Sequence, residues 1–391
     1  MVENKILIVG SLKTTHIRRL INKLGKGKKS NESISVLDTS NSWDYKYDQV
    51  EGINQIWGIQ STKISKLLFK IPKIRALIIA YYAKKRFKEF ESKEHFNIVS
   101  YQGVDFNTER LVSIAHMFNS LTHVAPLGSD VLRSPKLVEP LLKKAFKKLD
   151  YISIFKESDF GKELLSRFRI PDSKIVRAGY GSDVIDYIDN LGGTLSKEEM
   201  AMLLNLPESS YYISCGYNAN IEQNHEDILR ALAKNKDLLP KDYCVIVQLS
   251  YGIQKNELIE KLSSMSKTLG LKVCLITDFL SLEQVATLRL LTDLFIHVQT
   301  TDASNASILE YLLADTQVIN GAWLKYGFIE KNTMPYHICK SIENLGVCLR
   351  SVLSGETNKI IVSEETKQII RDFKSWKNLL EEWHSLFAKG V

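Results

Sequence analysis

Short apolar runs alternate with longer stretches of helical spacing along the first half of the chain. The apolar runs that predict buried strands are Lys5–Gly10, Ser33–Asp38, Ile53–Ile59, Phe96–Gly103, Leu121–Gly128, Tyr151–Phe155 and Lys174–Gly181. Between them, apolar residues recur every three or four positions over 16–24, 61–90, 109–118 and 134–148, which is typical of helices with one buried face. Strands that alternate with helices in this way predict βαβ units and a parallel sheet.

The same rhythm starts again at Tyr211. The strands predicted in the second half are Tyr211–Tyr217, Tyr243–Ser250, Leu271–Thr277, Asp293–Thr300 and a final short strand at Thr316–Asn320. Helical spacing fills the intervals, over 226–234, 255–269, 282–291 and 304–314. Between the two halves lies a segment, Asp183–Pro207, that contains two adjacent glycines and is taken as the boundary.

We therefore predict an α/β protein with two Rossmann-like domains whose parallel sheets face each other across a cleft. The first domain is expected over 1–190 and the second over 208–363. A helical segment over 364–391 is expected to pack back onto the first domain. Ligands of open parallel sheets bind beyond the carboxyl ends of the strands, so a cleft between two such edges suits a reaction of two substrates.

Composition places the chain among globular proteins, because 44% of its 391 residues are hydrophobic and 25% are charged. Its five cysteines are scattered through the second half without a CxxC pair, which argues against a disulfide framework and a zinc site and favours a reducing compartment. The N-terminus lacks the pattern of a signal peptide, and no apolar run is long enough to span a membrane. We expect a cytoplasmic protein.

The net charge of +7 favours an anionic partner. Basic residues crowd the segment 63–88, among them Lys84, Lys85 and Arg86, and apolar residues are interleaved close to helical spacing. A cationic amphipathic segment of this kind suits an anionic membrane surface, here the inner face of the cell membrane. The alternative is a core-packed helix with a solvated basic face. Nucleic acid is disfavoured as a partner because no binding-module signature is present.

The strongest chemical candidate is the stretch from His297 to Trp323, in which an apolar strand leads into the polar turn TTDASNAS and then into a helix. Ser304 is a suitable N-cap for that helix, and the free backbone N–H groups near Ser304 and Asn305 would attract phosphate. Asp302 would accept hydrogen bonds from adjacent hydroxyls of a sugar, and Glu310 would accept them from the ribose of a nucleotide. The alternative is an N-capped core helix with one solvated acid.

Two other strand ends of the second half carry uncharged polar groups. Gly216 permits close backbone approach to a ligand, and Asn218, Asn224 and His225 follow it. A polar turn with an asparagine cap is the alternative for this loop. Ser250 and Tyr251 follow the next strand, and they gain weight as candidates because that strand lies in the same domain.

In the first half, Asp130 follows a glycine and a serine at a strand end. A carboxylate in a cleft can act as general base on an acceptor hydroxyl, so Asp130 is the candidate catalytic base. The alternative is an Asx turn, in which the side chain only accepts hydrogen bonds from the nearby backbone.

The motifs GYNANIEQNH, VIVQLSYG and TDASNASILE, followed by VINGAWLKYG, resemble in this order the TDP-N-acetylfucosamine:lipid II N-acetylfucosaminyltransferases and, more broadly, the GT-B glycosyltransferases. The resemblance covers about residues 211–327. It implies a nucleotide diphosphate-sugar bound by the second domain, a saccharide acceptor bound by the first, and neither a metal nor another cofactor. The chain departs from the common pattern in having Asp302 as the first acid. It also has Asn218, Asn224 and His225 where an arginine and a lysine often grip the diphosphate.

With the resemblance added, glycosyl transfer from a nucleotide diphosphate-sugar to a saccharide acceptor is the leading hypothesis. A polyprenyl-linked acceptor in surface polysaccharide synthesis fits the cationic segment. A nucleotide-sugar epimerase of the same fold is an alternative that would turn over its substrate without an acceptor. A second alternative is a non-catalytic, membrane-associated binding protein with a degenerate site.

Overall fold

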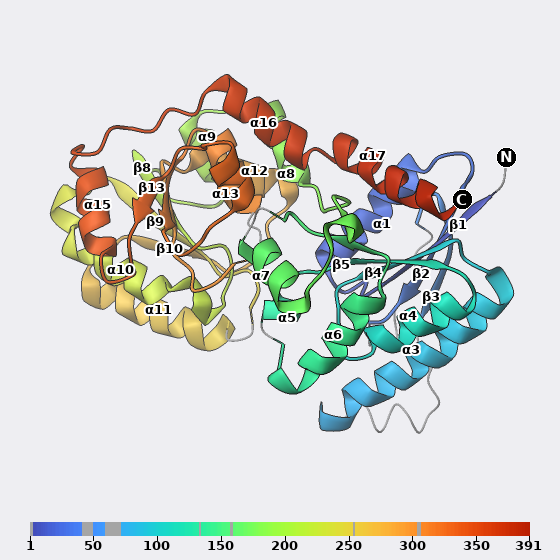
Figure 1. The fold of residues 1–391 in the computed structure, drawn as a ribbon. Coiled ribbons are helices and arrows are strands. Elements are labelled where there is room, and N and C mark those ends of the chain that lie inside the picture. The colour runs from blue at the N-terminus through green and yellow to red at the C-terminus, as the bar shows by residue number, and fades with distance from the viewer. Residues whose placement is uncertain are drawn as a thin grey trace. The chain divides into compact units, whose positions relative to one another are not determined.

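The computed structural model describes residues 3–40, 50–58, 72–132, 134–156, 159–252, 255–302 and 306–391. It consists of two compact units: Met1–Gly181 with Trp376–Val391, and Ser182–Ser375. In the described residues each unit is built on one parallel sheet (Figure 1), with strand order β3-β2-β1-β4-β5-β6-β7 in unit 1 and β10-β9-β8-β11-β12-β13 in unit 2. The predicted α/β class with two Rossmann-like domains is thereby confirmed.

Unit 1 begins with β1, whose side chains are buried on both faces of the sheet. Ile6 and Ile8 pack in a cluster with α1 and α17, whereas Leu7 and Val9 pack in a second cluster with α3, α4 and α6. This two-sided burial is typical of a parallel strand covered by helices. The elements of unit 1 are β1 (Asn4–Gly10), α1 (Thr15–Gly27), β2 (Glu32–Asp38), β3 (Ile53–Gly58), α3 (Pro72–Glu94), β4 (Ile98–Gln102), α4 (Thr108–Met117), β5 (Leu121–Ala125), α5 (Ser129–Leu132), η1 (Lys136–Val138), α6 (Glu139–Lys148), β6 (Tyr151–Ser153), α7 (Asp159–Phe168), η2 (Asp172–Lys174), β7 (Ile175–Val176), α17 (Trp376–Phe387) and η5 (Ala388–Gly390).

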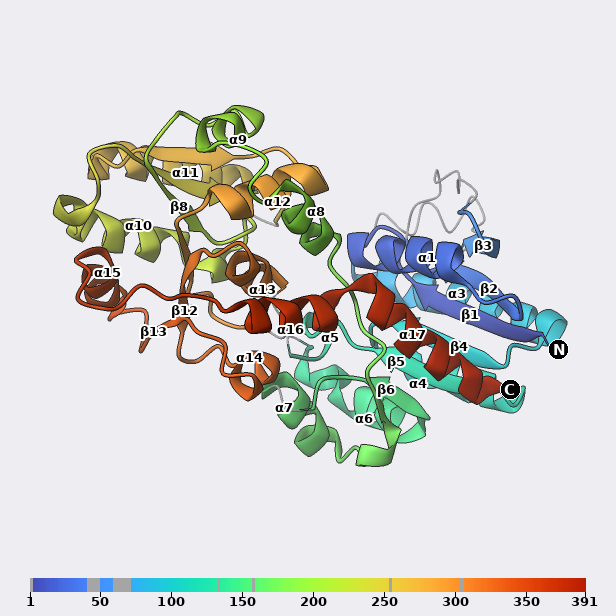
Figure 2. The same ribbon diagram turned by 90° about the horizontal axis from the view of Figure 1, so that it is seen from above.

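The last helix, α17, belongs to unit 1 and lies beside α1 (Figures 1 and 2). Trp383 is fully buried, and its indole Nε1 donates a hydrogen bond to the backbone oxygen of Gly179 at 2.9 Å. His384 Nδ1 lies 2.8 Å from the Glu32 carboxylate at the start of β2. The segment expected as one helix over 364–391 is therefore corrected to two helices, because Ser375 adopts an extended conformation that ends the first.

Unit 2 contains the second sheet and its helices. Its elements are α8 (Asp183–Leu191), α9 (Lys197–Leu203), β8 (Tyr211–Cys215), η3 (Ile221–Gln223), α10 (His225–Lys234), η4 (Lys236–Leu238), β9 (Tyr243–Gln248), α11 (Lys255–Leu269), β10 (Val273–Ile276), α12 (Leu282–Leu291), β11 (Leu294–His297), α13 (Ala306–Leu313), β12 (Gln317–Gly321), α14 (Gly327–Lys331), β13 (His337–Cys339), α15 (Leu345–Leu353) and α16 (Glu364–Lys374).

The segment that we took as the boundary, 183–207, contains α8 and α9, and both pack on α12 (Figure 2). Val184, Ile185 and Ile188 of α8 are buried in one cluster with Ile308 of α13, so the compact unit starts at Ser182. The sheet also continues past Thr316–Asn320, which was expected to be its last strand. The additional strand β13 is short and exposes Ile338, so it lacks the buried apolar run by which the others were recognised.

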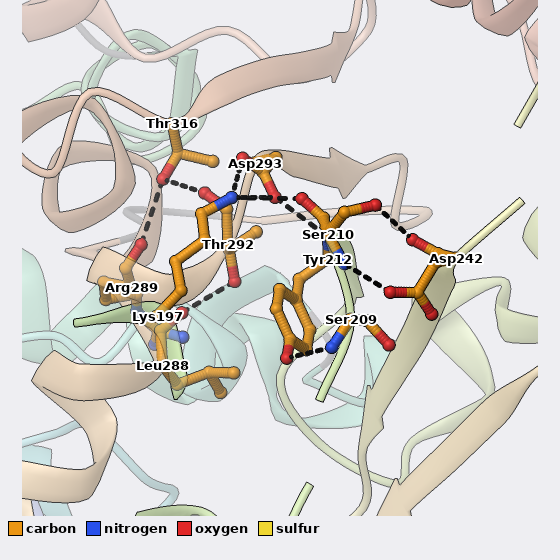
Figure 3. Close-up of polar contacts among 10 residues, drawn as sticks. All are labelled: Lys197, Ser209, Ser210, Tyr212, Asp242, Leu288, Arg289, Thr292, Asp293 and Thr316. Carbon is orange, nitrogen blue, oxygen red and sulfur yellow. Dashed lines mark hydrogen bonds and ion pairs between the residues drawn. The ribbon is translucent and has the colours of Figure 1, made fainter. Parts of the chain in front are cut away.

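The amino-terminal edge of the unit 2 sheet is closed by polar contacts (Figure 3). The Asp293 carboxylate accepts hydrogen bonds from Lys197 Nζ at 2.7 and 3.0 Å and from the Tyr212 backbone N–H at 2.9 Å. Thr316 Oγ1 lies 3.1 Å from the Arg289 backbone oxygen and 3.0 Å from that of Thr292. The polar groups of this edge are thus engaged with one another, whereas ligands of open parallel sheets bind at the opposite, carboxyl-terminal edge.

One acid of α3 is buried in the core of unit 1. The Glu91 side chain is fully buried and accepts hydrogen bonds from Ser120 Oγ at 3.1 and 3.2 Å and from the Phe96 backbone N–H at 3.4 Å. Burial raises the pKa of Glu91 to about 7, against the opposing effect of these hydrogen bonds.

Glu91 is expected to make the stability of unit 1 pH-dependent. Because its pKa is higher in the folded chain than in the unfolded chain, its contribution is fully present below the unfolded pKa and is lost as the pH rises towards 7 and beyond. Relative to wild type, Glu91→Gln should therefore gain about 3 kcal/mol of unfolding free energy between about pH 4.5 and pH 8. Denaturant unfolding of the full chain across that range measures the gain.

Glu94→Gln, on the same helix, controls for the loss of a carboxylate as such, because Glu94 is partly exposed and pairs with Lys5 at 3.3 Å. Parallel pH profiles for wild type and Glu91→Gln would show that the Glu91 proton is not linked to folding.

Candidate functional site

A cluster of polar side chains lies at the carboxyl ends of β8 and β11 in unit 2, with Gln299 at its centre. The Gln299 carboxamide oxygen accepts hydrogen bonds from Tyr217 OH at 3.2 Å and from Gln223 Nε2 at 2.6 Å. Its backbone oxygen accepts a third from Trp323 Nε1 at 2.8 Å. The buried Gln299 thus joins the loops that follow β8, β11 and β12, and all four side chains involved are neutral.

The second part of the cluster is a chain of hydrogen bonds that ends on Asp302. Tyr326 OH donates to Asp302 Oδ2 at 3.0 Å, and His297 Nε2 lies 2.9 Å from the same hydroxyl. Because the hydroxyl hydrogen is directed to the carboxylate, the His297 Nε2–H is assigned as the donor to the hydroxyl oxygen. Burial lowers the pKa of His297 to about 3, so the imidazole is neutral.

Tyr326 is buried like His297, and its hydroxyl holds the Asp302 carboxylate in place. Burial, followed by the charge of Asp302, raises the pKa of Tyr326 well above its ordinary value, so it remains a hydrogen-bond donor. The Asp302 side chain is 13% exposed. The chain His297–Tyr326–Asp302 therefore holds one carboxylate oxygen in place, and a carboxylate has further acceptor sites for ligand hydroxyls.

The predicted residues of the loop after β8 form its framework. Gly216 has φ +62°, and a Cβ there would lie 2.5 Å from His225 Cε1, so only glycine fits beside the imidazole. His225 Nε2 donates to the Asn218 backbone oxygen at 2.8 Å, and the Asn218 side chain accepts from the Asn220 backbone N–H at 2.9 Å. Burial lowers the pKa of His225 to about 4, so this ring too is neutral. His225 and Asn218 are buried and shape the loop from within.

The remaining predicted residues of the β8 and β9 loops divide into inner and outer positions. Asn224 adopts the left-handed conformation (φ +56°), and its Nδ2 donates to the Val298 backbone oxygen at 2.7 Å, which ties the loop to β11. Ser250 is buried, whereas Tyr251 is 45% exposed. The Tyr251 backbone oxygen accepts from the Ala219 N–H at 2.6 Å, so the two loops are joined.

Glu310 lies in the second turn of α13 and is buried. Its Oε2 forms an ion pair with Arg289 Nε at 3.2 Å, and its Oε1 accepts a hydrogen bond from Ser182 Oγ at 2.7 Å. The Arg289 guanidinium also donates to Tyr311 OH at 2.8 Å and to Ser307 Oγ at 3.3 Å. The side chain that we expected to face a ribose is thus engaged on both oxygens within the unit. Ser304 and Asn305 lie outside the described residues.

Asp130, the candidate base, lies in α5 of unit 1. Its Oδ2 accepts hydrogen bonds from the Val104 N–H at 2.7 Å and the Leu127 N–H at 3.1 Å. Burial raises the pKa of Asp130, and the backbone hydrogen bonds oppose that shift. Tyr180 belongs to the same edge, because its hydroxyl donates to Gln102 Oε1 at the end of β4 at 2.6 Å.

The basic segment is described from α3 onwards. Lys84 and Lys85 are exposed, whereas Arg86 packs inward, where it pairs with Glu89 at 3.0 Å and lies 5.7 Å from the centre of the Phe90 ring. Leu77 lies two turns and Tyr81 one turn before Lys84 and Lys85, and they are 61% and 64% exposed. An apolar residue, an aromatic residue and lysines therefore follow one another along an exposed face of the helix.

Several residues of the cluster were not singled out from the sequence. Residues 297–323 were marked as the leading stretch, yet the structure adds residues from other segments. The residues missed in this cluster are Tyr217, His297, Gln299, Trp323 and Tyr326. In unit 1, Gln102 and Tyr180 were missed at the edge that carries Asp130. Tyr217 and Gln299 lie at or near the end of a predicted strand, as many polar turn residues do, and Tyr326 lies beyond the last predicted strand.

Within the described residues no group of three or more histidine, cysteine or acidic side chains is arranged to hold a metal ion. Nor does any helix in the described part of the chain have both the length and the apolar character needed to cross a bilayer.

No family model matches the chain, and no curated protein matches it either. Solved structures do. A glycosyltransferase from Rickettsia africae is 16% identical with a TM-score of 0.74, over 99% of this chain and 98% of its own. Anabaena HepE, solved with UDP and glucose, is 10% identical with a TM-score of 0.65, over 99% and 100%. A UDP-N-acetylglucosamine 2-epimerase is 14% identical with a TM-score of 0.57, over 99% and 97%.

At these identities the likeness concerns the fold. Two Rossmann-like units, matched along nearly the whole length to glycosyltransferases of the GT-B type, give the chain the GT-B fold. The narrower resemblance to the N-acetylfucosaminyltransferases has no counterpart among these neighbours.

The buried ion pair at Glu310 leads to a prediction about stability. Glu310→Ala should leave Arg289 as an uncompensated buried charge and lower the unfolding free energy of unit 2 by about 3–5 kcal/mol. The double variant Arg289→Leu/Glu310→Leu should be far less destabilised than the sum of the two single changes. Thermal and denaturant unfolding without any ligand measure both effects.

Glu330→Ala, which removes an exposed acid of α14, is the matched control. If Glu310→Ala unfolded with wild-type stability, the carboxylate would not be needed by the fold, and its role would have to be sought in ligand binding.

Proposed function

We propose that this protein is a glycosyltransferase that moves a sugar from a nucleotide diphosphate-sugar to a saccharide acceptor. The observation that carries the proposal is the Asp302 carboxylate, fixed by Tyr326 and His297 at the carboxyl-terminal edge of the unit 2 sheet. This is the edge at which open parallel sheets bind ligands. The fold is shared with a glycosyltransferase and with a protein solved with UDP and glucose, which supports the same class of donor.

In this proposal the donor lies against unit 2. Asp302 accepts hydrogen bonds from the sugar hydroxyls, and the backbone N–H groups at the start of α13 bind the diphosphate. The surrounding groups, Tyr217, Gln299 and the neutral His297, supply dipoles in place of cations. Fixed dipoles aimed at developing charge stabilise a departing nucleoside diphosphate. No metal ion and no other cofactor takes part.

The acceptor is assigned to unit 1, with Asp130 as the general base. The acceptor hydroxyl oxygen bonds to the anomeric carbon, the bond from that carbon to the diphosphate oxygen breaks, and the hydroxyl proton passes to Asp130. A carboxylate whose pKa is raised is better suited to accept that proton.

The donor and acceptor can be narrowed by the motif resemblance. We assign the protein to surface polysaccharide synthesis on the cytoplasmic side, with a sugar of the N-acetylfucosamine type and a polyprenyl-linked acceptor. Such an acceptor lies in a membrane, and the exposed stripe formed by Leu77, Tyr81, Lys84, Lys85 and Lys88 on α3 suits an anionic bilayer surface. Arg86 is left out of the stripe because it packs inward.

The epimerase of the same fold gives a second candidate function, nucleotide-sugar epimerisation. The two candidates differ in one requirement, since an epimerase needs no acceptor. A non-catalytic binding protein differs from both in releasing nothing.

Acceptor-dependent release of a nucleoside diphosphate is the expected activity. Wild type is incubated with UDP-, TDP- and GDP-sugars and with saccharide or polyprenyl-linked acceptors, in excess EDTA. Asp302→Asn should raise the donor KM at least about tenfold because a charge-assisted acceptor of hydroxyls is lost. Asp130→Asn should lower kcat by about 10²- to 10⁴-fold because the base is lost while an amide oxygen can still accept the backbone hydrogen bonds.

Asp237→Asn, an exposed acid of η4, is the control. If a sugar product formed from the donor without any acceptor, the activity would be epimerisation and not transfer. If no donor of the panel were consumed and none bound, the catalytic proposal would be overturned, and wild-type kinetics of Asp302→Asn would remove that residue from the site.

The membrane prediction concerns the α3 stripe. Wild type should sediment with vesicles that contain anionic lipid at low salt and dissociate at high salt, because exposed charges are screened. Replacing Lys84, Lys85 and Lys88 with glutamine should abolish sedimentation.

The control variant replaces Lys234, Lys241 and Lys267 of unit 2, which are also exposed, and so changes the net charge by the same amount. An equal loss of vesicle binding in both variants would show that only net charge matters. If the α3 variant sedimented like wild type, the α3 stripe would be excluded as the membrane-binding surface.

A further inference from the structure

A pair of cysteines at the outer edge of the unit 2 sheet takes no part in the proposed chemistry. Cys339 is the last residue of β13, and Cys348 lies in α15, the helix that packs on that strand (Figures 1 and 2). The two thiols are hydrogen-bonded to each other. A strand and a helix therefore meet at two sulfur atoms, which is the arrangement that a covalent cross-link requires.

Backbone groups of β13 and of the turn after it surround both sulfur atoms. Cys339 Sγ lies 3.0 Å from the Ser341 backbone oxygen, and Cys348 Sγ lies 3.8 Å from the backbone oxygen of Ile338, the residue before Cys339. The Cys348 sulfur thus lies against the β13 backbone itself. Cys339 is fully buried, whereas Cys348 is partly exposed, so small molecules approach the pair from the Cys348 side.

The hydrogen bond between the thiols favours the loss of one proton from the pair. It lowers the pKa of Cys339, and a backbone hydrogen bond at Ser341 acts in the same direction, against the effect of burial. The same contact raises the pKa of Cys348, which keeps its proton. Since the thiolate is the reactive form of cysteine, one sulfur is prepared to react and a second lies next to it.

The pair lies where unit 2 is weakly held. Among the described residues, β13 is the edge strand of its sheet, is three residues long and pairs with β12 alone. Ile338 of β13 is 61% exposed, and Val347 of α15 is 69% exposed. An edge strand with few buried contacts opens more easily than the core, so a covalent tie to α15 would limit that opening.

The strand β13 also supports the loop that follows β12, which belongs to the candidate site. The Cys339 backbone oxygen accepts a hydrogen bond from the Ala322 N–H at 2.8 Å. The next residue, Trp323, donates to the Gln299 backbone oxygen at 2.8 Å. A tie between β13 and α15 would therefore also hold a support of the polar cluster around Gln299.

A second pair of thiols in unit 2 has a geometry that opposes a cross-link. Cys244 of β9 and Cys274 of β10 are also hydrogen-bonded to each other. Cys274 lies opposite Ile246, two residues beyond Cys244, so the two cysteines are diagonal neighbours on parallel strands. Ordinary strand spacing then places their Cα atoms about 8 Å apart, more than the roughly 7 Å that a disulfide spans.

We propose that Cys339 and Cys348 form a reversible disulfide, which ties α15 to β13 when the protein meets hydrogen peroxide. The Cys339 thiolate attacks one peroxide oxygen, the O–O bond breaks, and a sulfenic acid and hydroxide form. The Cys348 sulfur then attacks the Cys339 sulfur, and the S–O bond breaks with release of water. Overall, two thiols are oxidised to one disulfide and the peroxide is reduced to two waters. Thiol reductants reverse the reaction by exchange.

Peptide mapping of the full chain tests the disulfide directly. The reduced protein is treated with hydrogen peroxide, its remaining thiols are alkylated, and tryptic peptides are identified by mass spectrometry. Trypsin cleaves between the two cysteines at Lys340, so the disulfide joins peptide 332–340 to peptide 341–350. We expect the joined peptides in most molecules of wild type, and we expect dithiothreitol to separate them.

The second pair of thiols is the internal control. Cys244 and Cys274 also lie on separate tryptic peptides, 242–255 and 273–289. These peptides should remain unjoined under the same treatment, because the β9 and β10 backbones are too far apart for the bridge.

Amide hydrogen exchange measures the tie between the elements. In oxidised wild type, exchange across β13 and α15 should slow by at least about tenfold relative to the reduced protein, because the cross-link restricts opening. Cys348→Ser should show no slowing. Cys274→Ser, which removes a partly exposed thiol of the other pair, is the matched control and should slow like wild type. Peroxide also oxidises methionine, and Cys348→Ser treated in the same way measures that effect.

Each outcome decides for or against the disulfide. If peptides 332–340 and 341–350 stayed unjoined after peroxide treatment, the proposal would be refuted. If the peptides of Cys244 and Cys274 were joined to the same extent, oxidation would follow unfolding and not the local geometry, which would also refute it. Joined peptides without slower exchange would refute the tie between α15 and β13. The inference is independent of the proposed function, because no nucleotide or acceptor is used.

Discussion

Parallel strand pairing, with helices over both faces of each sheet, is the constraint on which the remaining features depend. Strands such as β1 and β8 are buried on both faces, so neither face is available to a ligand. At the strand ends, by contrast, a side chain can be both rigidly held and reachable. In unit 2 the amino-terminal edge is occupied by its own contacts around Asp293. The polar groups of the carboxyl-terminal edge are thus the residues available for chemistry.

Among the described residues of that edge, the two histidines carry no charge and the buried arginine is paired. His225 and His297 are neutral because burial depresses the pKa of each. Arg289 is engaged by Glu310 and Tyr311. A diphosphate bound here would be stabilised by amides, hydroxyls and the end of α13 rather than by point charges. Dipoles that are fixed before the ligand arrives cost little reorganisation, which is why the hydrogen bonds joining Tyr217, Gln299 and Trp323 matter to the proposed chemistry.

The fold was predictable because its signal is local. The apolar runs of β8, β9 and β12 and the spacing of α11 and α12 each identify an element within a short window. The prediction failed where that signal was weak, as at β13, or misleading, as at Lys174–Gly181, where only Ile175–Val176 pair as β7. The break at Ser375 has no proline or glycine to mark it. The packing of α8 on α12 depends on surfaces that are distant in sequence.

The candidate site was predictable in place but not in composition. Strand ends directed attention to Gly216, Asn218, Tyr251 and Asp302, all of which lie at the carboxyl-terminal edge. What each side chain does depends on partners remote along the chain. Ser182, 128 residues away, bonds to Glu310, and Tyr326 bonds to Asp302 across 24 residues. No local spacing reports such contacts.

Glu310 shows how the buried pair and the donor site are connected. Arg289 pairs with Glu310 and also donates to Ser307 in the first turn of α13, the turn whose backbone is proposed to bind the diphosphate. Removing Glu310 would free a buried guanidinium and disturb that turn, so nucleotide binding would fall even without a direct contact between Glu310 and ribose. Loss of binding on substitution of Glu310 therefore does not identify a ligand-binding residue. Substitution of Asp302 is a cleaner test of ligand binding, because its side chain is partly exposed and does not hold a buried charge in place.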